Sequence, residues 1–279
     1  MKFSILIAHY NNARYFQQCF DSLISQTYTN WEAIILDDGS KENEKNAVKE
    51  IIKDDVRFKF FENAQNQGVG FTKNKLIELA SGEILGYVDP DDAILPTAIE
   101  KSIAAFKKNN KVVLTYSRFM ECDKNLKPIV PFKSAKQVEN NSLYFFNCPI
   151  VINHFVCFRK ETYETTEKMN TDLKIAEDQD LYLKLYEKGN VEFINETNYL
   201  YRTHEGGISQ NENKKSSYDY WGKVIWYAMK RRKLTVINGK KIPKEFTSSQ
   251  ENFQLLDYQN SISFRIKKKV KLLFQNLFD

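Results

Sequence analysis

The sequence lacks any hydrophobic run long enough to cross a membrane as a helix, so a membrane-spanning chain is not expected. Its first apolar run, residues 4–8, is also too short for the hydrophobic part of a signal peptide. The 4 cysteines are widely spaced and form no Cys-x-x-Cys pair, which argues against a zinc site or a disulfide framework. Together these absences predict a cytoplasmic protein with reduced thiols.

An excess of charge of one sign is also missing, because 41 Lys and Arg residues oppose 36 Asp and Glu residues and leave a net charge of +5. So mild an excess does not indicate a nucleic-acid partner. Hydrophobic residues make up 42% and charged residues 28% of the chain, which is typical of a folded core. The 279 residues suit one large domain, or a domain with an appended tail.

Short apolar runs alternate with helical patterns through the first half of the chain. One helical pattern places Phe16, Phe20 and Leu23 on a single face. The apolar runs predict buried strands at residues 3–8, 31–36, 57–61, 84–88 and 112–116. This rhythm predicts an α/β fold of βαβ units, with a mainly parallel central sheet flanked by helices.

The alternation stops after residue 117. Residues 121–149 are polar and without clear periodicity, which predicts a long functional loop. Beyond this loop the patterns predict short strands and two helices, namely strands at 155–158, 191–194 and 198–201 and helices at 178–187 and 218–230.

Polar clusters follow three of the predicted strands, at residues 9–11, 37–40 and 89–92. In a parallel sheet these strand ends lie along one edge, where ligands of α/β proteins bind. Asp89 and Asp91 would repel each other there unless a cation joined them, and a hard divalent ion bridging to phosphate oxygens fits best. The alternative is an acidic turn that caps the helix after Pro96, and a lone Asp-x-Asp does not decide between the two.

These segments, taken together and in this order, resemble the inverting nucleotide-sugar glycosyltransferases of family two, which have the Rossmann-like GT-A fold. The resemblance covers about the first three quarters of the chain. The matching segments are residues 4–11, 25–28, 35–40, 66–68, 73–74, 81–84, 89–92, 177–181 and 201–204.

The resemblance implies a donor-binding set at the sheet edge. Tyr10 would stack on the nucleobase, Asp38 would accept a hydrogen bond from it, and Asp89 would hold the ribose or the surroundings of the metal. Lys73 would lie near the diphosphate. The full implied donor-binding set is Ala8, Tyr10, Asn11, Asp38, Gly68, Lys73 and Asp89.

The resemblance also implies Mn²⁺ or Mg²⁺ as cofactor, with Asp91, Asp89 and His204 as its candidate ligands. Asp178 is the expected general base, which would take a proton from the acceptor hydroxyl. Glu177 beside it is the second candidate. Without the resemblance, this acidic pair is better interpreted as a negatively charged helix start, which the helix dipole favours.

Two positions depart from the family pattern. Ala8 stands where the family often has Pro or Thr, and an Arg is common near the position of Lys73. Lysine is a point charge without the two-pronged hydrogen bonding of arginine, so this departure weakens the role of Lys73 more than the fold prediction.

We expect three parts along the chain. Residues 1–117 form the nucleotide-sugar-binding half, residues 118–210 the acceptor-binding and catalytic half of the same GT-A domain, and residues 211–279 a C-terminal helical extension. Residues 264–278 combine an apolar stripe with five basic residues. This pattern fits a helix on the cytoplasmic membrane surface and equally a helix folded back on the domain.

The sequence therefore predicts a metal-dependent inverting glycosyltransferase. It would transfer a sugar from a nucleoside-diphosphate sugar, preferably a UDP-sugar, to a hydroxyl of a glycan or lipid-linked acceptor. The expected process is the synthesis of a bacterial surface polysaccharide. A non-catalytic sugar-nucleotide or glycan-binding module is the alternative. A nucleotidyltransferase ranks lower, because residues 9–11 stand where that class has a glycine-rich phosphate loop.

Overall fold

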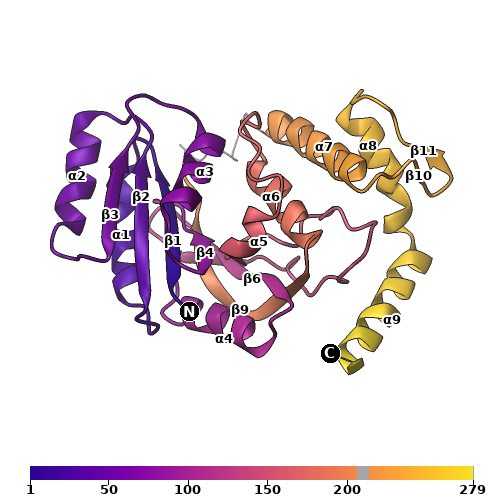
Figure 1. Cartoon of the computed structure of the whole chain (residues 1–279), viewed down its shortest axis with the longest axis horizontal. Helices are drawn as coiled ribbons and strands as arrows, with labels where there is room; N and C mark the ends of the chain where they lie inside the picture. Colours follow the sequence, from indigo (N-terminus) through magenta and orange to yellow (C-terminus); the bar gives the residue numbers. More distant parts are fainter. Residues whose placement is uncertain (206–213, 279) are drawn as a thin grey trace.

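The computed structural model describes residues 1–205 and 214–278, without the side chains of 214, 215 and 273–278. One mixed β-sheet crosses these residues, with helices on both of its faces (Figure 1). In spatial order its strands are β3 (Phe58–Glu62), β2 (Trp31–Asp37), β1 (Phe3–His9), β4 (Ile84–Tyr87), β8 (Cys157–Arg159), β6 (Val112–Cys122), β9 (Asn190–Arg202) and β5 (Ala93–Ile94). A further strand, β7 (Pro128–Pro131), pairs with β6.

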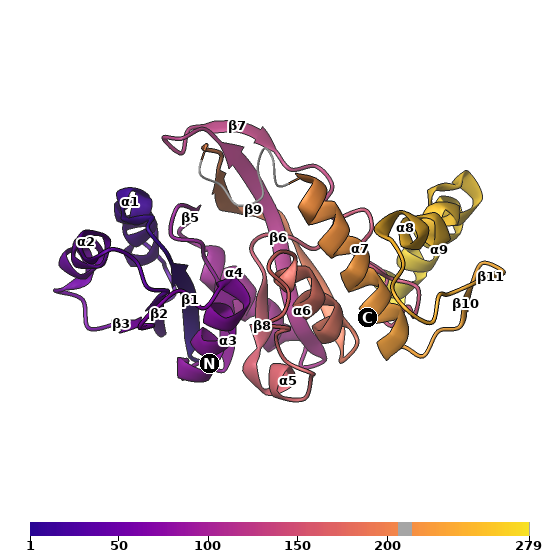
Figure 2. The same cartoon turned by 90° about the horizontal axis from the view of Figure 1, so that it is seen from above.

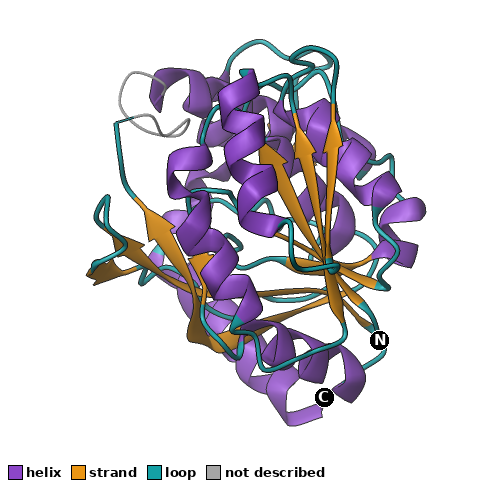
Figure 3. Cartoon of the chain, turned by 90° about the vertical axis from the view of Figure 1, so that its left-hand side faces the viewer, coloured by secondary structure: helices purple, strands orange, loops and turns teal. Residues whose placement is uncertain are grey.

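The strands β3, β2, β1 and β4 run parallel to one another, and β6 runs parallel to β9. The carboxyl ends of β1, β2 and β4 therefore lie along the same edge of the sheet, where the arrows run into loops in Figure 3. The strands β5, β7 and β8 pair in antiparallel fashion. The predicted α/β fold with a mainly parallel sheet is confirmed.

Alternation along β1 separates two hydrophobic cores, because successive side chains of a strand point to opposite faces. Ile5 joins the core under α1, α2 and α4, whereas Leu6 joins the core under α3, α6 and α7. The helices are α1 (Ala13–Ile24), α2 (Glu42–Ile52), α3 (Val69–Leu79), α4 (Ala98–Lys108), α5 (Lys160–Glu164), α6 (Glu177–Tyr186), α7 (Lys214–Arg231), α8 (Ser249–Leu256) and α9 (Ile262–Phe278).

Two local predictions are wrong. The two short strands predicted at 191–194 and 198–201 are one strand, β9, because the long partner β6 pairs along its whole length. The loop predicted at 121–149 begins with the end of β6 and contains β7, so it is not free of regular structure.

The C-terminal helices lie at the other end of the molecule from β1, β2 and β3, as Figures 1 and 2 show from two directions. Nevertheless α7 packs buried side chains, among them Val224 and Met229, into the core shared with α3 and α6. The predicted boundary at 210/211 lies outside the described residues, and β6 crosses the one at 117/118. Among the described helices, none combines the length and apolarity needed to span a membrane.

Candidate active site

The loops after β1 and β2 are joined by a set of short polar contacts. His9 is fully buried, and its Nδ1 atom lies 2.7 Å from Oδ2 of the equally buried Asp37. The Asn11 N–H donates to Ser40 Oγ over 2.9 Å, and Asn11 Oδ1 accepts from the Lys41 N–H over 3.0 Å. Two of the predicted strand-end clusters therefore form one rigid surface.

Tyr10 follows the last residue of β1 at this edge, and 51% of its surface is exposed. A half-exposed aromatic ring next to a buried histidine that contacts Asp37 offers a firmly held surface for stacking. Ala8, two residues earlier, is partly buried and pairs with Leu36 of β2. The predicted stacking of a base on Tyr10 stays a prediction.

Asp38 joins the end of β2 to the loop before α3. Its Oδ1 accepts hydrogen bonds from Asn63 Nδ2 at 2.8 Å and the Gln67 N–H at 2.9 Å, and its Oδ2 accepts from the Gly68 N–H at 2.9 Å. Only 4% of Asp38 is exposed. The carboxylate thus fixes the backbone around Gly68, a role that sequence reasoning missed, and this leaves it limited capacity to accept a bond from a base.

A second group of charges links α3 to the start of α6. The Lys73 ammonium lies 2.7 Å from Glu177 Oε1, and Glu177 is buried while Lys73 is partly buried. Burial on its own would lower the pKa of Lys73, but the carboxylates of Glu177 and Asp89 raise it above its ordinary value. Lys73 therefore stays charged among carboxylates.

The two acidic residues at the start of α6 have different surroundings. Glu177 is 5% exposed and held by Lys73, whereas Asp178 is partly exposed and accepts from the Gln179 N–H at 2.7 Å. The residue before them, Ala176, has a left-handed backbone with φ of 64°. Of the pair, Asp178 is the carboxylate that a substrate hydroxyl can reach without first breaking an ion pair.

A third group forms where β9 ends beside the loop after β4. His204 Nε2 lies 2.7 Å from Asp91 Oδ2, and the His204 ring lies 4.7 Å from the ring of Tyr15. The Arg202 guanidinium packs over the same tyrosine at 4.4 Å and donates from Nε to the Asp91 carbonyl oxygen. Sequence reasoning missed Tyr15, since nothing local distinguishes it from an ordinary residue of a helix.

Asp92 holds the residues of this third group together. Its carboxylate accepts from the Tyr199 hydroxyl at 2.7 Å and from the Arg202 N–H at 2.7 Å, and it is 1% exposed. Burial first, then the charges of Asp91 and Asp89, raise the pKa of Asp92. Asp92 therefore anchors the end of β9 to the acidic loop and is not available to a ligand.

Comparison with known proteins identifies the family. The model of the family described as Glycosyl transferase family 2 matches residues 4–166, which is more than half of the chain. The chain belongs to glycosyl transferase family 2. This confirms the predicted family and enzyme class. The matched range includes the predicted residues from Ala8 to Asp91 but ends before Glu177, Asp178 and His204.

Similar proteins include bacterial polysaccharide synthases. The chain is 29% identical to a chondroitin synthase of Escherichia coli over 206 residues, 70% of this chain and 28% of the synthase. It is 26% identical to a hyaluronan synthase of Pasteurella multocida over 196 residues, 70% of this chain and 20% of that synthase. The chain thus spans less than a third of the length of these relatives.

Solved structures confirm the GT-A fold. S. aureus TarS 1–349 in complex with UDP-GlcNAc is similar with a TM-score of 0.68 at 20% identity, over 92% of this chain and 70% of that chain. The mannosyltransferase PcManGT from Pyrobaculum calidifontis, in complex with GDP-Man and Mn²⁺, gives a TM-score of 0.58 at 13% identity, over 82% of this chain and 63% of that chain.

A divalent metal, which this family typically uses, suits the charge of this edge. Asp91 Oδ2 and His204 Nε2 are ligand atoms of suitable type placed 2.7 Å apart. Burial first, and then the nearby charges of Asp91 and Asp178, raise the pKa of Asp89, as expected where carboxylates outnumber cations. In the described part of the chain no cluster of three or more metal-binding side chains occurs, so oxygens of a ligand would have to complete the coordination.

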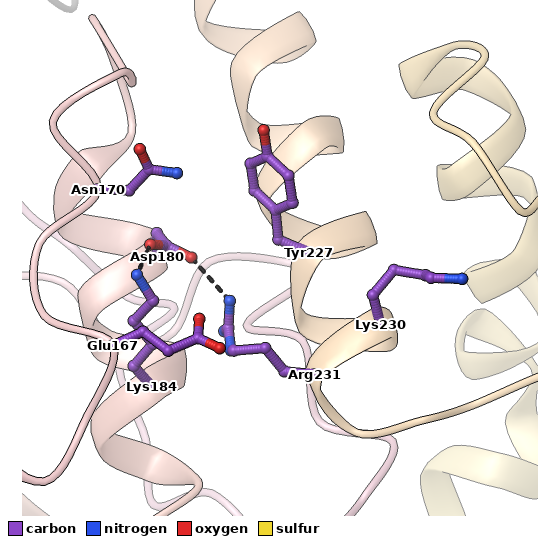
Figure 4. Close-up of a pocket in the computed structure, with 7 residues that line it drawn as sticks. All are labelled: Glu167, Asn170, Asp180, Lys184, Tyr227, Lys230 and Arg231. Atoms are coloured by element: carbon purple, nitrogen blue, oxygen red, sulfur yellow. Dashed lines mark hydrogen bonds and ion pairs between the residues drawn. The ribbon is translucent and has the colours of Figure 1, made fainter.

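A cavity of about 450 Å³ lies on the other side of α6, between this helix and α7 (Figure 4). Inside it, Asp180 pairs with Arg231 at 3.0 Å and with Lys184 at 2.6 Å. Asp178 and Asp180 are two positions apart on a helix and so point in nearly opposite directions. This cavity is therefore not the predicted donor site, and its ion pairs instead fix α6 against α7.

Proposed function

We propose that this glycosyltransferase moves a sugar from a UDP-sugar donor to a hydroxyl of a glycan or lipid-linked acceptor, with inversion at the anomeric carbon. The observation that carries this proposal is the meeting of Asp91 with His204, and of Lys73 with Glu177, at the edge where β1, β2 and β4 end. The UDP-GlcNAc complex of TarS and the polysaccharide synthases among the relatives support a UDP-sugar and a polysaccharide product.

In the proposed donor complex, the base stacks on the exposed ring of Tyr10, a contact worth about 1–3 kcal/mol in comparable sites. The loop that Asp38 holds around Gly68 bounds the donor, and Asn11 and Ala8 line the β1 side. Lys73 contributes a positive charge toward the diphosphate. Its bond to Glu177 keeps the ammonium oriented.

Asp91, His204 and Asp89 are the candidate protein ligands, and together with diphosphate oxygens they would hold Mn²⁺ or Mg²⁺. Such an ion, when bound, neutralises the charge that develops on the departing nucleoside diphosphate. The buried anchor of Asp92 keeps the Asp91 loop and the end of β9 together, so the two ligands do not have to be organised anew for each donor.

Asp178 acts as the general base in this proposal. It accepts the proton of the acceptor hydroxyl while that oxygen attacks the anomeric carbon, and the bond to the diphosphate oxygen breaks on the opposite side. One displacement inverts the configuration, and no covalent sugar-enzyme intermediate forms. Glu177 is less suited, because its carboxylate is buried and already held by Lys73.

An Asp178→Asn variant tests this assignment. We expect kcat for release of nucleoside diphosphate to fall by about 10²–10⁴-fold, while donor affinity stays within a few-fold of the unmodified protein. Asp172→Asn is the matched control, because Asp172 is an exposed aspartate in the preceding loop, and its activity should not change.

Three outcomes would count against the proposal. A chain that binds nucleotide sugars and never releases nucleoside diphosphate is a binding module, the alternative predicted above. Loss of activity in Glu177→Gln with normal donor affinity and an active Asp178→Asn would move the base to Glu177. No binding of any nucleotide sugar with Mn²⁺ or Mg²⁺ would reject the function altogether.

The location of the enzyme is a separate part of this proposal. We place it in the cytoplasm, where activated sugar nucleotides and lipid-linked acceptors meet at the inner membrane surface. Nucleic acid is not among the proposed partners, since the net charge of the chain is only +5.

A further inference from the structure

The helix α9 presents its apolar row outward instead of toward the protein. Ile262, Ile266 and Val270 are spaced four residues apart and therefore share one face of the helix. Their exposed fractions are 76%, 56% and 45%. A helix that belongs to a domain core normally buries such a row, so the outward position of these three side chains requires an explanation.

The opposite face of α9 attaches the helix to the rest of the chain. The Phe264 ring packs edge-on against Tyr258 at 5.1 Å, and the Lys268 ammonium lies 5.8 Å from the centre of the Phe145 ring. Lys271 pairs with Glu139 at 3.2 Å. Polar and aromatic contacts thus determine the orientation of the helix and leave the apolar row facing away.

Basic side chains border the exposed row on both sides. With about 3.6 residues per turn, Arg265 and Lys269 fall on one side of the row and Lys267 on the other. All three are exposed. The segment 262–278 contains five basic residues and no acidic residue, so its charge equals the net charge of +5 of the whole chain.

We propose that this outer face of α9 docks on an anionic lipid bilayer, with the row of Ile262, Ile266 and Val270 entering the interface and the flanking cations meeting lipid phosphates. Apolar side chains between cations fit a surface that is negatively charged outside and apolar beneath. Nucleic acid would use the cations but gain little from the apolar row. A second copy of α9 would bring like charges together.

The position of α9 suits such an attachment. The helix lies at the far end of the molecule from β1, β2 and β3 in both Figure 1 and Figure 2, and so it lies away from the strands that carry the proposed base-binding residues. This inference does not depend on the proposed function, because binding to vesicles is measured without turnover.

Flotation of the full chain with lipid vesicles tests the inference. We expect binding to vesicles of phosphatidylcholine mixed with phosphatidylglycerol, no binding to phosphatidylcholine alone, and release at high ionic strength, where surface charges are screened. A soluble glycerol phosphate added in excess should not compete, because it lacks an apolar layer. Its competition would indicate an anion site instead of a bilayer surface.

Two sets of variants separate the two contributions. Replacing the three outward cations by glutamine should weaken binding by about 100-fold, at about fivefold for each residue (Arg265→Gln, Lys267→Gln, Lys269→Gln). Replacing the apolar row by serine should weaken it by at least about tenfold (Ile262→Ser, Ile266→Ser, Val270→Ser). The matched control removes three exposed lysines elsewhere and should bind normally (Lys240→Gln, Lys241→Gln, Lys244→Gln).

The inference is overturned if the unmodified chain ignores anionic vesicles, or if the control set weakens binding as much as the outward set. It is also overturned if the serine variant changes sedimentation from dimer to monomer, because a second copy would then occupy the row. Thermal unfolding of each variant confirms that the fold is intact, and the exposed position of all six residues predicts little change in it.

Discussion

Neighbouring residues can have the same chemistry and still differ in what they can do. Glu177 and Asp178 are both acidic and begin the same helix, yet one is buried and held by Lys73 and the other is partly exposed. Asp91 and Asp92 differ in the same way, because Asp92 is enclosed by Tyr199 and Arg202. The tertiary contacts of each side chain, and not its residue type, separate the proposed chemical role from the structural one.

Gly39 offers a sharp test at the residue scale. Its φ is +77°, and a Cβ atom there would lie 2.7 Å from the backbone of Gln65 and Asn66, which cannot move aside easily. We expect Gly39→Ala to lower the free energy of unfolding by about 2–4 kcal/mol, from backbone strain and overlap together. Urea unfolding measures this difference.

Gly239 is the matched control for this substitution. It has the same φ of +77°, but nothing lies within 4 Å of the position of its Cβ. Gly239→Ala should therefore cost only the backbone strain, about 1–2 kcal/mol. Equal losses at the two positions would show that the backbone of residues 65–66 accommodates the added Cβ without cost.

At the scale of elements, Glu32 joins the strands of the nucleotide half. Its carboxylate is buried in β2 and accepts bonds from Lys2 and Lys59, both at 2.8 Å, and from Ser4 at 2.7 Å. Burial on its own would raise the pKa of Glu32, but these bonds lower it well below its ordinary value. The carboxylate is therefore a source of stability that acid removes.

The sign of this pH dependence follows from the lowered pKa. Glu32 contributes its full stability above its unfolded pKa of about 4.5, and the contribution falls as the pH drops below that value toward the folded pKa. We expect Glu32→Gln to cost about 2 kcal/mol at neutral pH and progressively less below pH 4.5. Urea unfolding of both proteins between neutral and acidic pH measures this.

The exposed pair of Lys53 and Glu50 provides the comparison. Glu50→Gln removes a carboxylate that also has a lysine partner, but both side chains are solvated, so we expect little change in stability at any pH. A Glu32→Gln protein that remains as stable as the unmodified chain at neutral pH would contradict this account of β2.

At the scale of the whole molecule, the candidate site exists only because distant segments meet. Asp91 follows β4, and His204 stands 113 positions later, beyond β9. Lys73 and Glu177 are 104 positions apart. A ligand held by both pairs would therefore stabilise the whole chain against unfolding, since the unfolded chain cannot form the site.

Thermal unfolding with UDP and Mn²⁺ measures this linkage. At a UDP concentration of about 100 times its Kd, we expect the free energy of unfolding to increase by about 2.7 kcal/mol, which corresponds to roughly 5–10 °C in Tm. A chelator should abolish most of the shift, and so should Asp91→Asn. The exposed-residue control Asp172→Asn should keep it. A full shift by UDP in the presence of chelator would show that no metal takes part in donor binding.

Sequence by itself determined the parallel half of the fold and the edge at which the candidate site lies. The buried strands β1, β2 and β4 are mostly apolar, and a cluster of polar residues follows each of them. These signals are local, so the order of residues along the chain is enough to locate the three polar clusters, and the family resemblance singles out Tyr10, Asp38 and Asp91 within them. The acidic pair at Glu177 and the apolar stripe of α9 are also visible in the sequence, but only as patterns with more than one meaning.

Only the tertiary structure decided how those residues are used. The engagement of Asp38 with the Gly68 loop, the pairing of Lys73 with Glu177, and the ring contact of Tyr15 with His204 all join segments far apart in the chain. The same holds for the single strand β9, whose length depends on its partner β6, and for the exposure of the apolar row on α9. Such features depend on which distant groups share a neighbourhood, and no local pattern contains that information.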